Sequence, residues 1–124
     1  MIEILTPNFI FEDERGLLVQ LVREGFRQVN VISSIKGAVR GGHFHKLNHE
    51  AFYIISGEVE LIVNRGAQRE THNFKDGDMF QIPPYIVHEF IFNTDALLVS
   101  MYDLGAELPD GGMDIYKQEV CVCI

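Results

Sequence analysis

Short runs of β-branched and aromatic residues alternate with turn residues along most of the chain, and helical periodicity is nearly absent. Runs of this length bounded by Gly, Asn and Asp are typical of β-strands. The pattern predicts strands over residues 17–22, 28–32, 51–55, 58–63, 79–82, 87–92 and 96–102, and it allows a last strand over 115–124. Many short strands at this spacing favour an all-β sandwich or barrel.

Composition and charge narrow the class of protein. The 124 residues suffice for one hydrophobic core, so a single domain over residues 1–124 is expected. The net charge of -8 argues against a nucleic-acid binder, although a few arginines could still hold a small anion. No apolar run is long enough to cross a bilayer, and no signal-peptide pattern opens the chain, so we expect a cytoplasmic protein without a membrane partner.

Two segments near the C-terminus carry weaker signals. Residues 105–114 are the most loop-like part of the chain and could form a surface loop or a lid. Cys121 and Cys123 would share one face of a last strand, as two half-buried residues. Their number and context do not favour a disulfide framework.

The stretch RGGHFHKLNHE, residues 40–50, is unusually rich in histidine. On a strand, His43 and His45 share one face; Glu50 opens the next strand, and His88 lies on a later strand among apolar neighbours. A barrel can aim these four side chains into one cavity, where they would suit Zn, Fe, Mn or Ni. The alternative is that they are hydrogen-bonded polar residues without a special role.

The spacing of these residues resembles that of the single-domain cupins. The first cupin motif is matched without mismatch by Gly37, His43, His45, Glu50 and Gly57. The second is matched in part by Gly77, Pro83 and His88, with Tyr85 where the motif has glycine. The resemblance implies an all-β double-stranded β-helix, or jelly-roll barrel. It also implies a divalent transition metal on His43, His45, Glu50 and His88, and a homodimer formed through sheet edges.

A second resemblance concerns the chemistry. The pieces DERG (residues 13–16), QVN (28–30) and GAVRGGH (37–43) resemble the entrance strands of dTDP-4-keto-6-deoxyhexose 3,5-epimerases. The stretch RGGHFHK, residues 40–46, resembles the 3,4-ketoisomerases of the same superfamily. The resemblance implies an isomerase or epimerase that moves a proton next to the ketone of a nucleotide-activated keto-deoxyhexose.

The same resemblance implies a role for several residues. His43 would be the active-site base, His45 the second catalytic histidine, and Arg40 would lie beside the sugar or the diphosphate. Gln28 and Asn30 would line the pocket from a neighbouring strand. Lys46 and Tyr53 are further candidates for substrate binding. The acid that returns the proton could be a histidine or one of three tyrosines, Tyr53, Tyr85 and Tyr102.

Glu50 separates two chemical alternatives. In the ketoisomerases this position is often an amide or another neutral residue and no metal is used, whereas a related group of capsule-biosynthesis cupins combines the same entrance with a metal site. If Glu50 and His88 bind a metal, His43 is a ligand and cannot also be a free base. A metal-dependent cupin of other chemistry, such as a small-molecule oxygenase or isomerase, and a non-catalytic sugar-binding cupin are the competing functions.

Overall fold

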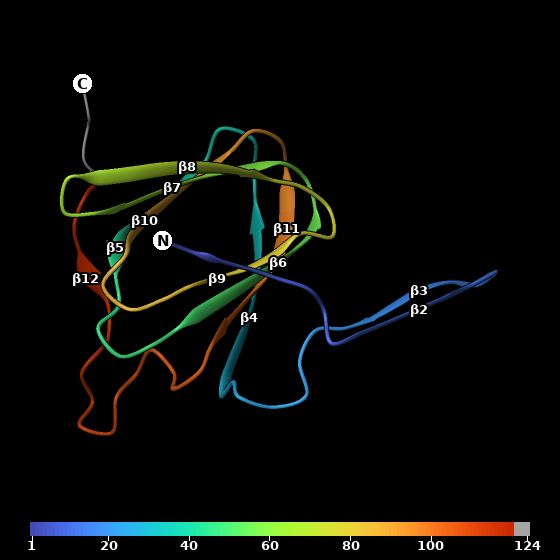
Figure 1. Ribbon diagram of the computed structural model, residues 1–124, viewed down its shortest axis with the longest axis horizontal. Helices are drawn as coiled ribbons and strands as arrows, with labels where there is room; N and C mark the ends of the chain where they lie inside the picture. The colour runs from blue at the N-terminus through green and yellow to red at the C-terminus, as the bar shows by residue number, and fades with distance from the viewer. Residues whose placement is uncertain (121–124) are drawn as a thin grey trace.

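The computed structural model describes residues 1–120, and all regular secondary structure in that part of the chain is β-strand (Figure 1). The all-β class expected from the sequence is therefore confirmed. Each of the seven strands predicted from apolar runs is present, with bounds that differ by at most two residues. None of the residues described forms a helix long and apolar enough to span a membrane.

Ten of the strands form two five-stranded antiparallel sheets. The first sheet has the strand order β1–β9–β6–β11–β4, with β1 at Glu3–Leu5, β9 at Met79–Ile82, β6 at Glu50–Ser56, β11 at Ala96–Tyr102 and β4 at Gln28–Ser34. The second sheet has the order β12–β5–β10–β7–β8, with β12 at Tyr116–Lys117, β5 at Val39–Phe44, β10 at Val87–Phe92, β7 at Val59–Arg65 and β8 at Gln68–Phe74.

The hydrophobic core lies between these two sheets. Alternate residues of the first sheet, such as Phe52, Ile54 and Leu98, meet Leu61 and Phe90 of the second, and all are buried. This period of two is the expected result when one face of each strand is covered. A smaller cluster covers part of the outer face of the first sheet, where the segment 21–26 packs over buried residues that include Met79 and Met101.

Apolar runs do not predict β8, and they predict β12 only in part. β8 is polar along most of its length because it forms the edge of the second sheet and buries little more than Phe74. β12 covers only two residues of the expected last strand, because only Tyr116 and Lys117 pair with β5. Cys121 and Cys123 lie outside the described residues.

The remaining two strands form a hairpin of their own. β2 (Phe9–Asp13) and β3 (Gly16–Gln20) pair with each other and with no other strand among residues 1–120. In Figure 1 this hairpin, drawn in blue, projects away from the two sheets. We call residues 9–20 the arm.

The turn between β6 and β7 depends on a glycine that no other residue can replace without strain. Gly57 has a φ of 106°, and a Cβ atom there would lie 2.5 Å from the Asp95 carbonyl oxygen. Gly66 also has a positive φ, of 60°, but a Cβ atom there would meet nothing within 4 Å.

We therefore expect Gly57→Ala to lower the free energy of unfolding by about 3 kcal/mol, from backbone strain and overpacking together. Gly66→Ala, with the strained backbone alone, should cost only about 1 kcal/mol. Urea denaturation of both variants tests this, and equal losses would contradict it.

Candidate active site

A cavity of about 280 Å³ opens between the two sheets beside β4 and β5. Its apolar lining is formed by Ile32, Phe52, Phe90, Phe92 and Leu98. Its polar lining comes from Asn30, Arg40, His43, Glu50, His88, Ser100 and Tyr102. An apolar pocket with a few convergent polar groups is the usual form of a small-molecule site.

A β-bulge places Arg40 and His43 on the same side of β5. Residues three apart on a regular strand point to opposite faces. Here His88 pairs with His43 but Glu89 pairs with Gly41, so Gly42 is an extra residue in β5. Gly41 and Gly42 both have positive φ, and a Cβ atom on Gly41 would lie 2.6 Å from the His88 carbonyl oxygen. The two glycines therefore allow both side chains to line the cavity.

At the inner end of the cavity, the Glu50 carboxylate is buried among hydrogen-bond donors. His45 Nε2 lies 3.0 Å from Oε1, and the Ser100 hydroxyl donates to Oε2 at 2.6 Å. Burial by itself would raise the pKa of Glu50, but the hydrogen bond from His45 and the neighbouring His88 ring lower this pKa to about 2. Glu50 is thus an ionised carboxylate at neutral pH.

His45 is held as the cationic partner of Glu50. Its Nδ1 donates to the Asp114 carbonyl oxygen at 2.6 Å, while its Nε2 faces the Glu50 carboxylate. Both partners are acceptors, so both ring nitrogens carry a proton. Burial alone would lower the pKa of His45, but the hydrogen bond and charge of Glu50 outweigh it and raise the pKa. His45 is therefore a donor in this arrangement and not a base.

His43 has the opposite electrostatic character. Burial, followed by the charges of His88 and His45, lowers the pKa of His43 to about 4, so its imidazole is neutral at neutral pH. Its ring lies edge-on to that of His88, with centroids 4.6 Å apart. A neutral imidazole at the wall of a cavity can accept a proton from a bound molecule.

His88 leaves one ring nitrogen without a partner. Its Nδ1 donates to the Ile86 carbonyl oxygen at 3.0 Å, while its buried Nε2 has no hydrogen-bond partner among the residues described. The nearest carboxylate atom, Glu50 Oε1, is 3.6 Å away, beyond hydrogen-bond range. Nε2 therefore faces the histidine cluster without a partner, in the position that a metal-binding nitrogen would take.

The four predicted metal ligands do come together. One ligand atom from each of His43, His45, Glu50 and His88 lies within 4.8 Å of all the others. Ligand atoms bound to one ion at 2.0–2.2 Å stand at most about 4.4 Å apart, so a small adjustment would let all four reach it. Three nitrogens and a carboxylate oxygen fit a divalent transition metal, provided that His45 gives up its Nε2 proton.

Tyr102 is the tyrosine that the structure brings to the cavity. It pairs with Glu50 across β11 and β6, so their side chains share the inner face. Burial and the adjacent Glu50 carboxylate raise the pKa of Tyr102, so its hydroxyl keeps its proton. Tyr53 pairs with Val99 on the opposite face of the same sheet and does not line the cavity. Tyr85 is exposed and stacks on Phe44 outside the sandwich.

The remaining predicted residues divide between the cavity and the surface. Asn30 lines the cavity, and Gln28 donates to its amide oxygen at 3.4 Å. Arg40 is anchored by its Nε, which donates to the Ser34 hydroxyl at 2.7 Å. Lys46 does not line the cavity, because its ammonium group lies 4.2 Å above the centre of the Tyr116 ring.

The segment 105–114 is fastened to the site by Asp114, a residue that nothing in the sequence singles out. Its buried carboxylate accepts hydrogen bonds from the backbone of Lys46, Leu47 and Asn48 at 2.9–3.0 Å. The Asn48 amide in turn donates to the Gly105 carbonyl oxygen. Both ends of the segment are thus bonded to the turn after His45, which indicates a supporting loop and not a free lid.

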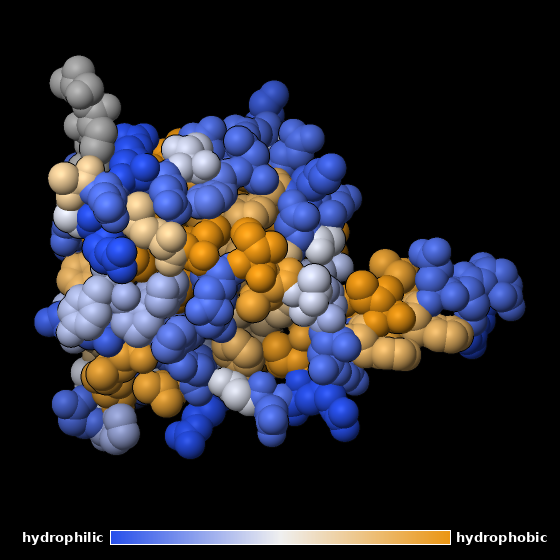
Figure 2. Space-filling model, in the orientation of Figure 1, coloured by the Kyte–Doolittle hydropathy of each residue, from blue (hydrophilic) through white to orange (hydrophobic). Residues whose placement is uncertain are grey.

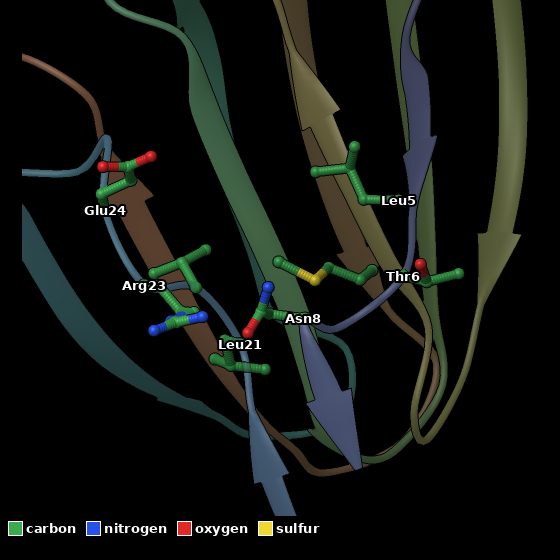
Figure 3. A pocket seen from close by; sticks show the side chains of 8 residues that line it. Leu5, Thr6, Asn8, Leu21, Arg23 and Glu24 are labelled. Carbon is green, nitrogen blue, oxygen red and sulfur yellow. The ribbon is translucent and has the colours of Figure 1, made fainter.

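A larger hollow of about 710 Å³ lies elsewhere, at the base of the arm. Figure 3 shows Leu5 and Thr6 on one side of it, Arg23 and Glu24 on the other, and Asn8 next to Leu21 between them. It is an open surface groove beside β9 and contains none of the histidines. Glu50 and His88 line the smaller cavity between the sheets, whereas His43 lines both this cavity and a surface groove of about 870 Å³ beside Lys117. The candidate chemistry is therefore assigned to the smaller cavity, where His43 meets Glu50 and His88.

Comparison with known proteins gives one matching family and several solved structures. The family model described as polysaccharide biosynthesis C-terminal domain matches residues 11–104. A search of curated protein sequences returned no significant match. The fold is similar to that of a 3,4-ketoisomerase from Helicobacter canadensis, with a TM-score of 0.76 and 19% identity, over 89% of this chain and 87% of that one.

Two further structures are similar over most of the chain. One is the sugar 3,4-ketoisomerase QdtA from Thermoanaerobacterium thermosaccharolyticum in complex with TDP, with a TM-score of 0.73 and 20% identity, over 82% of this chain and 80% of that one. The other is dTDP-4-dehydrorhamnose 3,5-epimerase from Sulfolobus tokodaii, with a TM-score of 0.70 and 20% identity, over 82% and 69%. These likenesses confirm the jelly-roll cupin fold expected from the motifs.

The lowered pKa of His43 predicts how stability changes with pH. Between pH 6.5 and 4 the unfolded chain binds a proton on His43 and the folded chain does not, so the stability from this group is lost as pH falls through that window. The melting temperature of the wild type should therefore fall more steeply between pH 6.5 and 4 than that of His43→Asn. The same comparison with His72→Asn on β8 controls for loss of a histidine, and identical slopes for wild type and His43→Asn would refute the assignment.

Proposed function

The chain belongs to the polysaccharide biosynthesis C-terminal domain family, and on this basis we propose that it is a sugar-nucleotide isomerase or epimerase. It would act on a keto-deoxyhexose by moving a proton next to the ketone. The observation that carries the proposal is the cavity wall, where the neutral His43 imidazole and the Arg40 guanidinium face the same space. The cytoplasmic location and the homodimer expected from the sequence stay predictions.

The size and lining of the cavity support a sugar ring as the group that enters it. Its volume of about 280 Å³ is near the lower end of the range for ligand pockets, about 300–1,000 Å³. A nucleotide would then remain outside, with Arg40 placed at the wall for an anionic group. The apolar lining formed by Phe52, Phe90 and Leu98 suits the methyl group of a deoxysugar. One of the similar solved structures is a mutant of QdtA in complex with TDP-4-keto-6-deoxyglucose. This complex is the reason for proposing a nucleotide-linked keto-deoxyhexose as the substrate class.

The proposed chemistry needs a base, a stabilised oxygen and a proton return. His43 takes the proton from the carbon beside the ketone, the C–H electrons form a C=C bond, and the carbonyl oxygen becomes an enolate. Tyr102 and Asn30 offer polar groups to that oxygen from the cavity wall. If the proton returns to the former carbonyl carbon, and the hydroxyl on the adjacent carbon gives its proton to the enolate oxygen, the ketone moves by one position. If the proton instead returns to the opposite face of the carbon that lost it, the product is an epimer.

A second candidate function is that of a metal-dependent cupin, a small-molecule oxygenase or isomerase. The observation that favours it is the orphaned Nε2 of His88, which faces Glu50 and His43 in a buried cluster. A bound Zn, Fe, Mn or Ni ion would supply Lewis acidity or redox chemistry there. Ser100 and Asp114 would then orient Glu50 and His45, as groups behind metal ligands commonly do.

Deuterium exchange tests the isomerase. In deuterated water, wild-type protein with a dTDP-4-keto-6-deoxyhexose should place deuterium beside the ketone. His43→Asn should lower kcat/KM by about 1,000-fold, because general-base catalysis typically contributes 10²–10⁴-fold, with a smaller change in KM. His72→Asn should leave both constants unchanged. No deuterium incorporation by folded wild-type protein would reject the proposal, and binding without turnover would favour a sugar-binding cupin.

Metal analysis of protein purified without chelators tests the second candidate. A metal-dependent cupin should retain about one equivalent of a transition metal, because a site with four protein ligands holds its ion tightly. Glu50→Gln should lose most of that metal, whereas Glu70→Gln on β8 should keep it. Less than about a tenth of an equivalent in the wild type would reject a resident metal.

A further inference from the structure

Two side-chain amides on β4 lie next to each other beside the active site. Gln28 and Asn30 are two residues apart on this strand, so their side chains share its inner face. Asn30 lines the cavity, whereas Gln28 lies between Asn30 and the backbone of Ala106 in the segment 105–114. An amide turned by half a rotation keeps its shape but exchanges its donor for its acceptor. The orientation of Asn30 therefore decides which polar group it offers to the cavity.

The backbone of the segment 105–114 fixes the orientation of Gln28. The N–H of Ala106 donates to Gln28 Oε1 at 2.8 Å. A backbone N–H can only donate, so the atom that faces it must be the amide oxygen, and Nε2 points the other way. The opposite orientation would bring two donors together in a half-buried place and leave both without an acceptor.

Gln28 in turn fixes the orientation of Asn30. Its Nε2 lies 3.4 Å from Asn30 Oδ1 and donates to it. Since Nε2 can only donate, the facing atom must be the oxygen of Asn30, and the Nδ2 amino group is turned away from Gln28. No residue within 1–120 accepts a hydrogen bond from Nδ2. The group that Asn30 offers to the cavity is thus a donor.

We propose that Gln28 is a positioning residue, which holds the N–H donor of Asn30 toward the substrate oxygen that becomes negative during the reaction. The catalytic part of this proposal rests on the proposed function. A donor that is already oriented stabilises an enolate oxygen without reorganisation, whereas a carbonyl in the same place would repel it. The orienting contact comes from Ala106, 78 residues from Gln28 along the chain. The segment 105–114 would therefore act on the reaction although none of its residues lines the cavity.

The position of Gln28 requires an acceptor and a donor on one side chain. Glutamate has the same shape as glutamine, but both of its oxygens are acceptors. In Gln28→Glu, one oxygen would still accept the Ala106 N–H, and the other would face Asn30. Asn30 would then turn its amide to donate Nδ2–H to the carboxylate, and its carbonyl would face the cavity. A substitution of a residue that does not line the cavity should thus reverse the polarity of the cavity wall.

Nuclear magnetic resonance of the side-chain amides tests the orientation. In the wild type, the Asn30 amide protons face the cavity, whereas in Gln28→Glu they should bind the carboxylate and exchange with solvent about tenfold more slowly. Gln68→Glu is the matched control, because it adds the same charge on β8, an exposed edge strand over which Figure 2 shows mostly hydrophilic residues. It should leave the Asn30 signal unchanged. An Asn30 amide that responds equally little to both substitutions overturns the proposal.

Kinetics with a double-mutant cycle test the positioning role. With a dTDP-4-keto-6-deoxyhexose, Gln28→Glu should lower kcat about 100-fold with little change in KM, because loss of one such donor typically costs 10²–10³-fold. Asn30→Ala should lower kcat as much, and the double variant should lose no more, because Gln28 acts through Asn30.

Two kinetic results would refute the positioning role. One is an unchanged kcat in Gln28→Glu although the Asn30 amide has turned. The other is a further loss when Gln28→Glu is added to Asn30→Ala, since the added charge would then act without Asn30. Absence of turnover in the wild type rejects the proposed function and with it the catalytic role of Asn30. The amide exchange rates need no turnover, so they decide the orientation in that case too.

Discussion

The arrangement of the cavity depends on one buried carboxylate. An ionised group inside a sandwich of apolar side chains costs several kcal/mol unless hydrogen bonds and an opposite charge surround it. Glu50 meets this requirement through His45 and Ser100, and His45 in turn requires the carbonyl of Asp114. The Glu50 carboxylate on β6 is thereby linked by hydrogen bonds to Ser100 of β11 and to His45 after β5, and through His45 to Asp114 in the loop before β12.

Around this charge, strand alternation and one irregularity bring apolar and polar side chains to the same cavity. Regular alternation on β6, β10 and β11 supplies the apolar side chains and the buried polar groups. The reactive groups depend on the bulge at Gly41 and Gly42, which turns Arg40 and His43 toward the same space. A side chain on Gly41 would collide with the backbone of β10, so this arrangement can form only because the residue is glycine.

Much of the molecule follows from the sequence, and the exceptions share a cause. Strands with a covered face were predicted within two residues, because burial imposes a visible period of two. β8 and β2 were not predicted from apolar runs, since β8 is a mostly polar edge strand and β2 belongs to the arm, which does not join the core. In the site, motif spacing brought His43, His45, Glu50 and His88 together. It could not choose Tyr102 over Tyr53, because that choice depends on which face each residue takes in the β6–β11 register.

The sequence by itself determined the all-β class, the inward positions of the main strands and the four residues of the histidine–glutamate cluster, because these follow from local period and fixed spacing. Only the tertiary structure decided that His45 lies between the Glu50 carboxylate and the Asp114 carbonyl oxygen, that the pKa of His43 is lowered, and that Ser100 and Asp114 support the pair of His45 and Glu50. The physical reason is that protonation depends on burial and on partners that the fold brings close, such as Asp114, which is 69 residues from His45 in the chain. The strand register that sets those partners forms only when the two sheets pack together.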